Sequence, residues 1–356
     1  MRAVVICHNA ELALVVLRAL RANRVRALLV CGKSAYTTLR SSRLAGAILC
    51  AGDLATRPEA IARAINERDR AEPIDIAMAA DVEGLRLLHK MRGSLQVPTY
   101  PMPDSATLDL LNDKWSFYRF AQGLGLNVPP TLFFARRQDI DPGRIERDVG
   151  FPAVVKPLSQ WASIGFRLVA DQQALAALTN DPTYRFDGMI VQRFIPGQDV
   201  GAGLFARAGT VQVLSTFFCG SRNATEFAPI PEFAGMINKI AVATRYDGVA
   251  NFDARIDESG RVWLIECNPR FFMRVTASRV CGLDFLKLGL PGTSPSIQPS
   301  ARGRYYSIGD VASVSGLGRL LSGRWPIRVL LNSLVEMCVD PAPSIVRRLS
   351  RDDAGA

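Results

Sequence analysis

The sequence predicts an α/β protein in which a parallel sheet is followed by a second, β-rich unit. Residues 1 to about 100 alternate short apolar runs with helical patterns, a βαβα rhythm that is typical of a Rossmann-like parallel sheet. From about residue 128 to about residue 270, apolar runs alternate with turn signals, which indicates strands joined by turns. We therefore expect two units of different construction.

The first unit contains four expected strands and three expected helices. The strands are the apolar runs 3–7, 25–31, 46–52 and 74–80. Helical patterns cover 10–22, 57–70 and 83–92. No GxGxxG follows the first strand, so a dinucleotide site is not supported. The apolar N-terminus is interrupted by His8, Asn9 and Glu11, which is unlike a signal peptide.

A proline-rich segment, VPTYPMPDS (97–105), indicates a linker after this unit. Two helices are expected to follow it. Asn112 is expected to cap the second helix, with Asp113 in its first turn and Gly123 or Gly125 at its end. Near the C-terminus, residues 326–339 are expected to be helical.

Composition narrows the functional classes. The chain has 356 residues and a net charge of +10, carried by 37 arginines and only 6 lysines that are spread without a basic block. Nucleic-acid binding is therefore not expected. Seven scattered cysteines without a CxxC, and only two histidines, argue against a zinc site and favour reduced thiols in a cytoplasm. No apolar run reaches the length of a membrane-spanning helix.

The segment VANFDARIDESGRVWLIECNPR (249–270) predicts a hairpin that closes at the turn signal DESG. In the expected pairing, Asp253 lies opposite Leu264, and Asn251 lies opposite Glu266. Since side chains alternate along a strand, Asp253, Leu264, Glu266 and Asn268 then share one face. Asp253 and Glu266 would be diagonal neighbours, roughly 7–8 Å apart.

The polar residues of this face suit a divalent cation. Asp253, Glu266 and Asn268 all offer hard oxygen ligands, which favour Mg²⁺, and Mg²⁺ held by few protein groups usually also binds substrate phosphates. The alternative is a solvated face whose acids pair with Arg255 or Arg270. Against it, Glu266 follows the apolar run VWLI, where a buried carboxylate needs partners.

Two further segments have patterns that suit a nucleotide. In FPAVVKPLSQWASIGFRLVAD (151–171), a strand ends at Lys156 and a loop of small polar residues follows, which suits phosphate oxygens. In GMIVQRFIPGQD (188–199), a strand runs into Gln192, and its edge can hydrogen-bond a planar base. Taken alone, each segment is better explained as an ordinary strand and turn.

Together, and in this order, these segments resemble the ATP-grasp superfamily, whose members include biotin carboxylase, the large chain of carbamoyl-phosphate synthase and D-alanine–D-alanine ligase. The resemblance covers roughly residues 1–295. It is carried by LNDKWSFYRFAQGLGLNVPPT (111–131), FPAVVKP (151–157), QRFIPGQD (192–199), NFDARID (251–257), LIECNPR (264–270) and CGLDF (281–285). No single motif decides the family, but their order and spacing are specific.

The resemblance implies a division of the chain. A Rossmann-like domain at 1–103 is expected to precede an ATP-grasp domain at 104–298, in which two α+β subdomains clasp ATP. The lid subdomain is expected at about 130–188, and a partly helical C-terminal extension at 299–356. The phosphate loop departs from many relatives because it has fewer glycines and contains the bulky Trp161.

The resemblance also implies roles for individual residues. The expected ATP contacts are Lys114, Lys156, Ser159, Ser163, Gly165, Gln192, Arg193, Phe194, Ile195 and Asp199. The expected metal ligands are Asp253, Glu266 and Asn268, for two Mg²⁺ ions that Mn²⁺ can replace. Arg270 and Lys156 are the expected catalytic residues, Arg270 because it matches an arginine that steadies the phosphorylated intermediate. Arg222, Arg274 and Arg279 remain open as acceptor contacts.

The activity implied is that of a stand-alone carboxylate–amine ligase. A carboxylate attacks the γ-phosphate of ATP to give an acylphosphate and ADP, and an amine then displaces phosphate. An ATP-binding protein without catalysis and a kinase that stops at phosphoryl transfer stay open as alternatives. The partners expected are small molecules, with a homodimer left open.

The C-terminal extension carries arginines beside apolar stretches. Arg324, Arg328 and Arg347 are examples, and such a pattern is compatible with an interfacial helix on an anionic membrane. The alternative, favoured by the sequence, is a tail helix that packs on the body of the protein.

Overall fold

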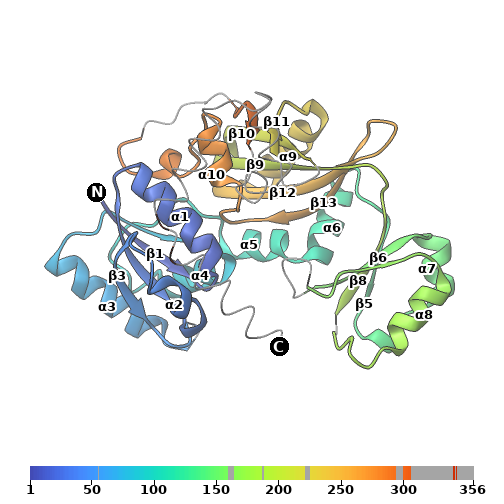
Figure 1. Ribbon diagram of the computed structural model, residues 1–356, viewed down its shortest axis with the longest axis horizontal. Coiled ribbons are helices and arrows are strands. Elements are labelled where there is room, and N and C mark those ends of the chain that lie inside the picture. Colours follow the sequence, from blue (N-terminus) through green and yellow to red (C-terminus); the bar gives the residue numbers. More distant parts are fainter. Residues whose placement is uncertain are drawn as a thin grey trace.

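The computed structural model describes residues 1–54, 56–158, 164–186, 188–220, 225–293 and 300–305, together with Asp340 and Ala342. Three sheets organise these residues (Figure 1). The N-terminal sheet and the sheet that contains β5, β6 and β8 lie at opposite ends of the molecule, and the long antiparallel strands bridge them. The expected α/β class is confirmed.

The N-terminal sheet is parallel, with the strand order β3-β2-β1-β4. Its strands are β1 (Arg2–Cys7), β2 (Arg26–Cys31), β3 (Ala45–Cys50) and β4 (Ile76–Ala79). Its helices are α1 (Ala10–Ala22), α2 (Lys33–Leu39), α3 (Pro58–Ala71) and α4 (Val82–Met91). Helix α2 was not predicted, because its seven residues bury only Ala35 and Leu39 and so leave no readable period.

Two consecutive helices, α5 (Ser105–Asn112) and α6 (Lys114–Gly123), connect this sheet to the rest. The prediction that Asn112 caps α6 was wrong. Asp113 is the cap, since its backbone is extended and its carboxylate accepts the N–H of Ser116 at 2.8 Å. Lys114 consequently occupies the first position of α6.

The smallest unit is a four-stranded antiparallel sheet with the order β5-β8-β6-β7. Its elements are β5 (Thr131–Phe134), α7 (Pro142–Asp148), β6 (Ala153–Pro157), β7 (Arg167–Val169), α8 (Gln172–Asn180) and β8 (Met189–Arg193), with a 3₁₀ turn at Arg137–Asp139. Apolar residues such as Ile145, Val155 and Leu175 give this unit a core of its own. We call residues 131–193 the lid.

The largest sheet has six antiparallel strands in the order β13-β12-β9-β10-β11-β14. The strands are β9 (Gln198–Arg207), β10 (Thr210–Cys219), β11 (Thr225–Phe227), β12 (Gly248–Ile256), β13 (Val262–Asn268) and β14 (Gly303–Tyr305). The helical elements are α9 (Pro231–Thr244), α10 (Val275–Val280) and the 3₁₀ turn Lys287–Gly289.

The large sheet shares a core with the N-terminal unit. Phe205 and Phe285 belong to the same buried cluster as Leu17 of α1, and the buried Tyr100 donates its hydroxyl to the carbonyl of Phe285 at 3.0 Å. Because this cluster includes no residue of the lid, the lid is the part best able to move as a unit.

Only a short part of the C-terminal extension is described. The fully buried carboxylate of Asp340 accepts hydrogen bonds from the Ser42 hydroxyl at 2.5 Å and from the Arg43 N–H at 3.1 Å. The extension therefore contacts the N-terminal unit. The helix expected at 326–339 lies outside the described residues, and so do Arg324, Arg328 and Arg347. Within the described ranges, no helix combines the length and apolar character needed to cross a membrane.

Candidate active site

A cavity of about 880 Å³ lies between the N-terminal sheet, the lid and the β12–β13 hairpin. The expected site residues that line it are Lys114, Lys156, Asp253, Glu266, Asn268 and Arg270. They come from α6, β6, β12 and the end of β13, so the fold brings together side chains that are up to 156 positions apart in the sequence, from Lys114 to Arg270.

The register of the acidic hairpin differs from the predicted one. Asp253 lies directly opposite Glu266 for two reasons: next to the turn Ile256 pairs with Val262, one position beyond the predicted register, and a bulge between Asp253 and Ala254 adds a second position and leaves Ile265 as the extra residue. Leu264 is therefore turned to the other face, where it is buried in the core. The prediction that Leu264 shares the acidic face was wrong. The bulge makes the two carboxylates nearest cross-strand neighbours, which are closer than diagonal ones.

The environment of this pair disfavours two negative charges. Burial, and then the charge of Glu266, raise the pKa of Asp253 to about 7. The Asn251 amide, which donates to Asp253 at 3.1 Å, opposes this shift, as does the charge of Arg274. Near neutral pH the pair thus holds a proton readily, and a cation placed between the carboxylates would relieve their repulsion.

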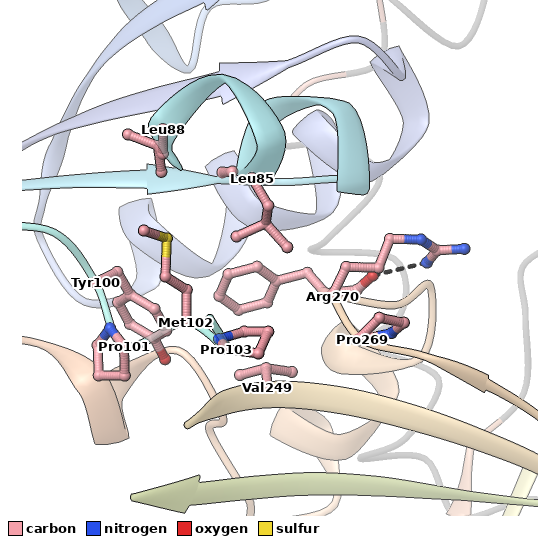
Figure 2. Close-up of a pocket in the computed structure, with 11 residues that line it drawn as sticks. Leu85, Leu88, Tyr100, Pro101, Met102, Pro103, Val249, Pro269 and Arg270 are labelled. Carbon is pink, nitrogen blue, oxygen red and sulfur yellow. Dashed lines mark hydrogen bonds between the residues drawn. The ribbon is translucent and has the colours of Figure 1, made fainter. Parts of the chain in front are cut away.

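Asn268 and Arg270 extend the acidic pair into a polar network. The Asn268 amide donates to Asp253 at 3.2 Å and to Glu266 at 3.4 Å, and its oxygen accepts from Arg270 at 2.9 Å. Arg270 also donates to the carbonyl of Phe271 at 2.8 Å. Figure 2 shows its guanidinium directed away from the apolar side chains of Leu85 and Leu88. The end of β13 therefore presents an acid, an amide and a guanidinium to one cavity.

The two expected lysines face the same carboxylate. Lys114 Nζ donates to the Leu158 carbonyl at 3.3 Å, and Lys156 Nζ donates to the Gln192 amide oxygen at 3.0 Å. Burial lowers the pKa of both lysines, and Glu266 is the strongest opposing influence on each. For Lys156, the charge of Lys114 lowers the pKa further. Two cations held this close are suited to a polyanion.

Gln192 lies beside Lys156 as expected, but its side chain is already engaged. It is 3% exposed, and its amide nitrogen donates to the Thr131 hydroxyl at 3.0 Å. The amide thus links β5 to Lys156 and holds the lysine in place. Its expected contact with adenine remains a prediction.

The remaining residues expected at the nucleotide, Arg193 to Ile195 at the adenine and Asp199 at the ribose, follow Gln192 but do not line the cavity. The backbone N–H of Arg193 donates to the Pro130 carbonyl at 2.9 Å, and Ile195 is buried. Asp199 forms an ion pair with Arg255 at 3.2 Å, and this guanidinium lies 4.9 Å from the ring centroid of Phe194. Their nucleotide contacts therefore remain predictions.

Several candidates in loops have different outcomes. Ser159, Trp161, Ser163 and Arg222 lie outside the described residues. Gly165 has φ +75°, and a side chain there would come within 2.6 Å of Pro157, so only glycine suits this turn.

The two other candidate arginines do not line the cavity. Arg274 donates to the Thr225 hydroxyl at 3.2 Å and lies 5.1 Å from the ring centroid of Phe217. Arg279, near the end of α10, is also absent from the cavity wall. A role in acceptor binding is a prediction for both.

The sequence did not single out the N-terminal side of the cavity. Residues after β1, β3 and β4 line it, namely His8, Asn9, Asp53, Leu54, Asp81, Glu83, Arg86 and Lys90. The signal was available, since ligands of parallel α/β sheets bind beyond the carboxyl ends of the strands. The absence of GxGxxG argued against a dinucleotide, and no other ligand was predicted at this edge of the N-terminal sheet.

Comparison with protein families identifies the central part of the chain. Residues 111–273, which include both lysines, the acidic hairpin and Arg270, match the ATP-grasp domain. The chain carries an ATP-grasp domain. The predicted resemblance to the ATP-grasp superfamily is therefore confirmed. The matched span begins just before α6 and ends just after β13.

Relatives and solved structures agree with this assignment. A D-alanine–D-alanine ligase of Pseudomonas entomophila is 27% identical over 235 residues, which cover 58% of this chain and 72% of the relative. The L-amino acid ligase of Bacillus licheniformis is 18% identical with a TM-score of 0.62, covering 84% of this chain and 77% of that one. N5-carboxyaminoimidazole synthetase of Staphylococcus aureus, complexed with ADP, is 14% identical with a TM-score of 0.65, covering 84% and 79%. Both structural likenesses show that the fold extends beyond the matched domain into the N-terminal unit.

Proposed function

We propose that this ATP-grasp protein is an ATP-dependent carboxylate–amine ligase that forms an acylphosphate and then an amide or related bond. The observation that carries the proposal is the convergence of two lysines, two carboxylates and one arginine on one cavity. This set binds and neutralises a metal-bound polyphosphate. Among the described residues that line the cavity there is no serine, and the one cysteine, Cys267, is buried. We therefore assign no side-chain nucleophile, and the chemistry rests on positioning and charge.

The residues at the hairpin fit Mg²⁺. Within the described ranges, no three His, Cys, Asp or Glu side chains gather at one point, so the ligand set proposed is two carboxylates, Asp253 and Glu266, with the Asn268 amide oxygen, which would turn from Arg270 toward the acids to bind the ion. Hard oxygen ligands and the repulsion within the acid pair both favour a divalent cation. Bound there, Mg²⁺ would supply charge neutralisation to phosphate oxygens. Two ions, and replacement by Mn²⁺, are part of the proposal.

The remaining side chains then have distinct roles. Lys114 and Lys156 hold phosphate oxygens as compact charges, and Gln192 keeps Lys156 directed into the cavity. Arg270, fixed by Asn268 and the Phe271 carbonyl, holds the carboxylate and its acylphosphate. The lid carries Lys156 and has its own core, so its closure would exclude water from the acylphosphate.

We propose domain boundaries that follow from these roles. Residues 1–103 form the Rossmann-like domain, 104–298 form the ATP-grasp domain with the lid, and 299–356 form the C-terminal extension. Small-molecule carboxylates and amines are the proposed substrates.

Metal binding is expected to weaken with acidity. A proton on Asp253 must leave before a cation binds, so Mn²⁺ affinity should fall about tenfold for each pH unit below the pKa of about 7. Electron paramagnetic resonance of free Mn²⁺, recorded at about pH 5.5–8, measures this affinity. An affinity that does not change with pH would contradict the prediction.

Without metal, the same pKa affects stability with a defined sign. The folded state holds the proton of Asp253 more tightly than the unfolded state, because the pKa rises from 3.8 to about 7. This residue therefore makes the metal-free protein less stable as the pH rises between those two values. Saturating Mg²⁺ should remove this loss in urea unfolding.

The function is tested by release of ADP and phosphate from Mg-ATP. Pools of amino acids and other small carboxylates are supplied with and without amines, and Glu266→Gln is the blank. We expect release that needs both a carboxylate and an amine and is absent in the variant. Accumulation of a stable phosphorylated product instead of free phosphate would identify a kinase, and bound ATP without turnover in any pool would favour a binding protein.

A further inference from the structure

The N-terminal sheet has a crevice that opens into the cavity. In the order β3-β2-β1-β4, the chain passes outward from β1 to β3 and then returns to place β4 on the other side of β1. The loops after β1 and β4 therefore diverge, and ligands of open α/β sheets bind in the crevice between such loops. His8 and Asn9 after β1, and Asp81 after β4, line the cavity at this point.

This crevice has the features of an anion site. Helix α1 begins directly after Asn9 and is 13 residues long, so its dipole favours a negative charge, while the Asn9 side chain already accepts the N–H groups of Glu11 and Leu12. Helix α4 begins directly after Asp81 on the neighbouring strand. Gly84 lets α4 approach β1 closely, because a side chain there would come within 2.7 Å of the Ile6 carbonyl.

The protein places its own carboxylate in this position. One oxygen of Asp81 accepts the N–H of His8 and that of Asn9, each at 2.7 Å, and the other accepts the N–H of Gly84 at 2.8 Å. Asp81 is only 5% exposed. Its carboxylate thus occupies the N–H groups that an incoming phosphate would need.

The charges around the crevice do not replace those donors. Arg86 is paired with Glu83 at 2.8 Å and with Asp109 at 3.0 Å. Lys90 lies nine positions after Asp81 along α4, or about 13 Å away at 1.5 Å per residue. Asp81, after β4, and Arg270, after β13, line the same cavity.

We propose that Asp81 is a specificity-determining residue that closes this crevice to phosphate groups. On the proposed ligase function, the substrate bound between the crevice and Arg270 is then a small amine or carboxylate without a phosphate at that end. A phosphorylated acceptor would meet a buried carboxylate in place of free N–H donors.

Inorganic phosphate is the probe, and backbone amide NMR of the full chain is the readout. In the wild-type protein, phosphate should leave the amide signals of His8 and Asn9 unchanged, while Lys114 and Lys156 report its binding at the other end of the cavity. Asp81→Ser keeps a cap for Gly84 but is too short to reach His8 and Asn9. In this variant both signals should shift and saturate, with phosphate bound at least about tenfold more tightly than in wild type.

Two results would overturn the proposal. One is a saturable shift of the His8 and Asn9 signals in the wild-type protein, a measurement that needs no variant. The other is a folded Asp81→Ser protein whose two signals ignore phosphate. Neither phosphate titration depends on turnover. A failure of the ligase assay would therefore not change the outcome for Asp81, and a failure of the Asp81 proposal would not change the outcome of the ligase assay.

Discussion

Replacing Glu266 with glutamine is expected to lower Mg²⁺-dependent ATP turnover by about a thousandfold or more. Glu266 is the group that most strongly supports the charge of both lysines, and it forms with Asp253 the cross-strand pair that is proposed to bind the metal. The substitution keeps the shape of the side chain and removes one carboxylate from the proposed ligand set. Steady-state ADP release, together with Mn²⁺ binding, measures both consequences.

Glu258→Gln is the matched control. Glu258 is exposed in the turn of the same hairpin, so its loss changes the net charge equally and leaves the cavity untouched. It should retain wild-type turnover. The metal-free melting temperature of Glu266→Gln is measured alongside turnover, because the variant loses both the repulsion with Asp253 and the charge that opposes the effect of burial on Lys114 and Lys156. Turnover of the Glu266 variant within about tenfold of wild type would refute the metal role.

Replacing Lys156 with methionine is expected to lower kcat/KM for ATP by about a hundredfold to a thousandfold. Lys156 is a half-buried cation near Lys114, and the pair concentrates positive charge where the triphosphate is proposed to lie. Arginine should not restore activity, because the slot beside Gln192 holds a compact ammonium rather than a planar guanidinium. ATP titration of initial rates gives the change.

The stability of this variant separates binding from folding. Methionine removes a charge whose pKa is lowered by burial and leaves the buried Gln192 amide oxygen without its donor, so the ligand-free protein should lose at most about 1–3 kcal/mol of stability. Lys33→Met, at an exposed position of α2, is the control and should behave as wild type. If Lys156→Met kept the wild-type KM for ATP together with the wild-type kcat, the proposed phosphate contact would be wrong.

The fold was predictable where apolar runs mark single elements. The four strands of the N-terminal sheet and the helices α1, α3 and α4 appear close to their expected positions, because each buries a continuous stretch or one face. Short elements gave no such signal, as α2 shows. The cap of α6 was misplaced by one residue because Asn112 and Asp113 both suit a cap, and only the extended backbone of Asp113 decides between them.

The sequence predicted which residues line the cavity better than it predicted how they pair and contact one another. The acidic face was read correctly for Asp253, Glu266 and Asn268, but the bulge at Ile265 leaves no trace in an apolar run. The partner of Lys156 depends on β6 pairing with β8, a long-range pairing that local sequence does not encode. Asp81 was missed for a related reason, since its importance comes from the neighbouring strand β1.

The most direct test of the ligase mechanism follows oxygen from the carboxylate to phosphate. Once a substrate carboxylate has been found, it is labelled with oxygen-18 and turned over with Mg-ATP and the amine. Attack of the carboxylate on the γ-phosphate places one labelled oxygen in the released phosphate, and that is the predicted result. Unlabelled phosphate, formed at the same rate as product, would show that no acylphosphate forms and would contradict the mechanism.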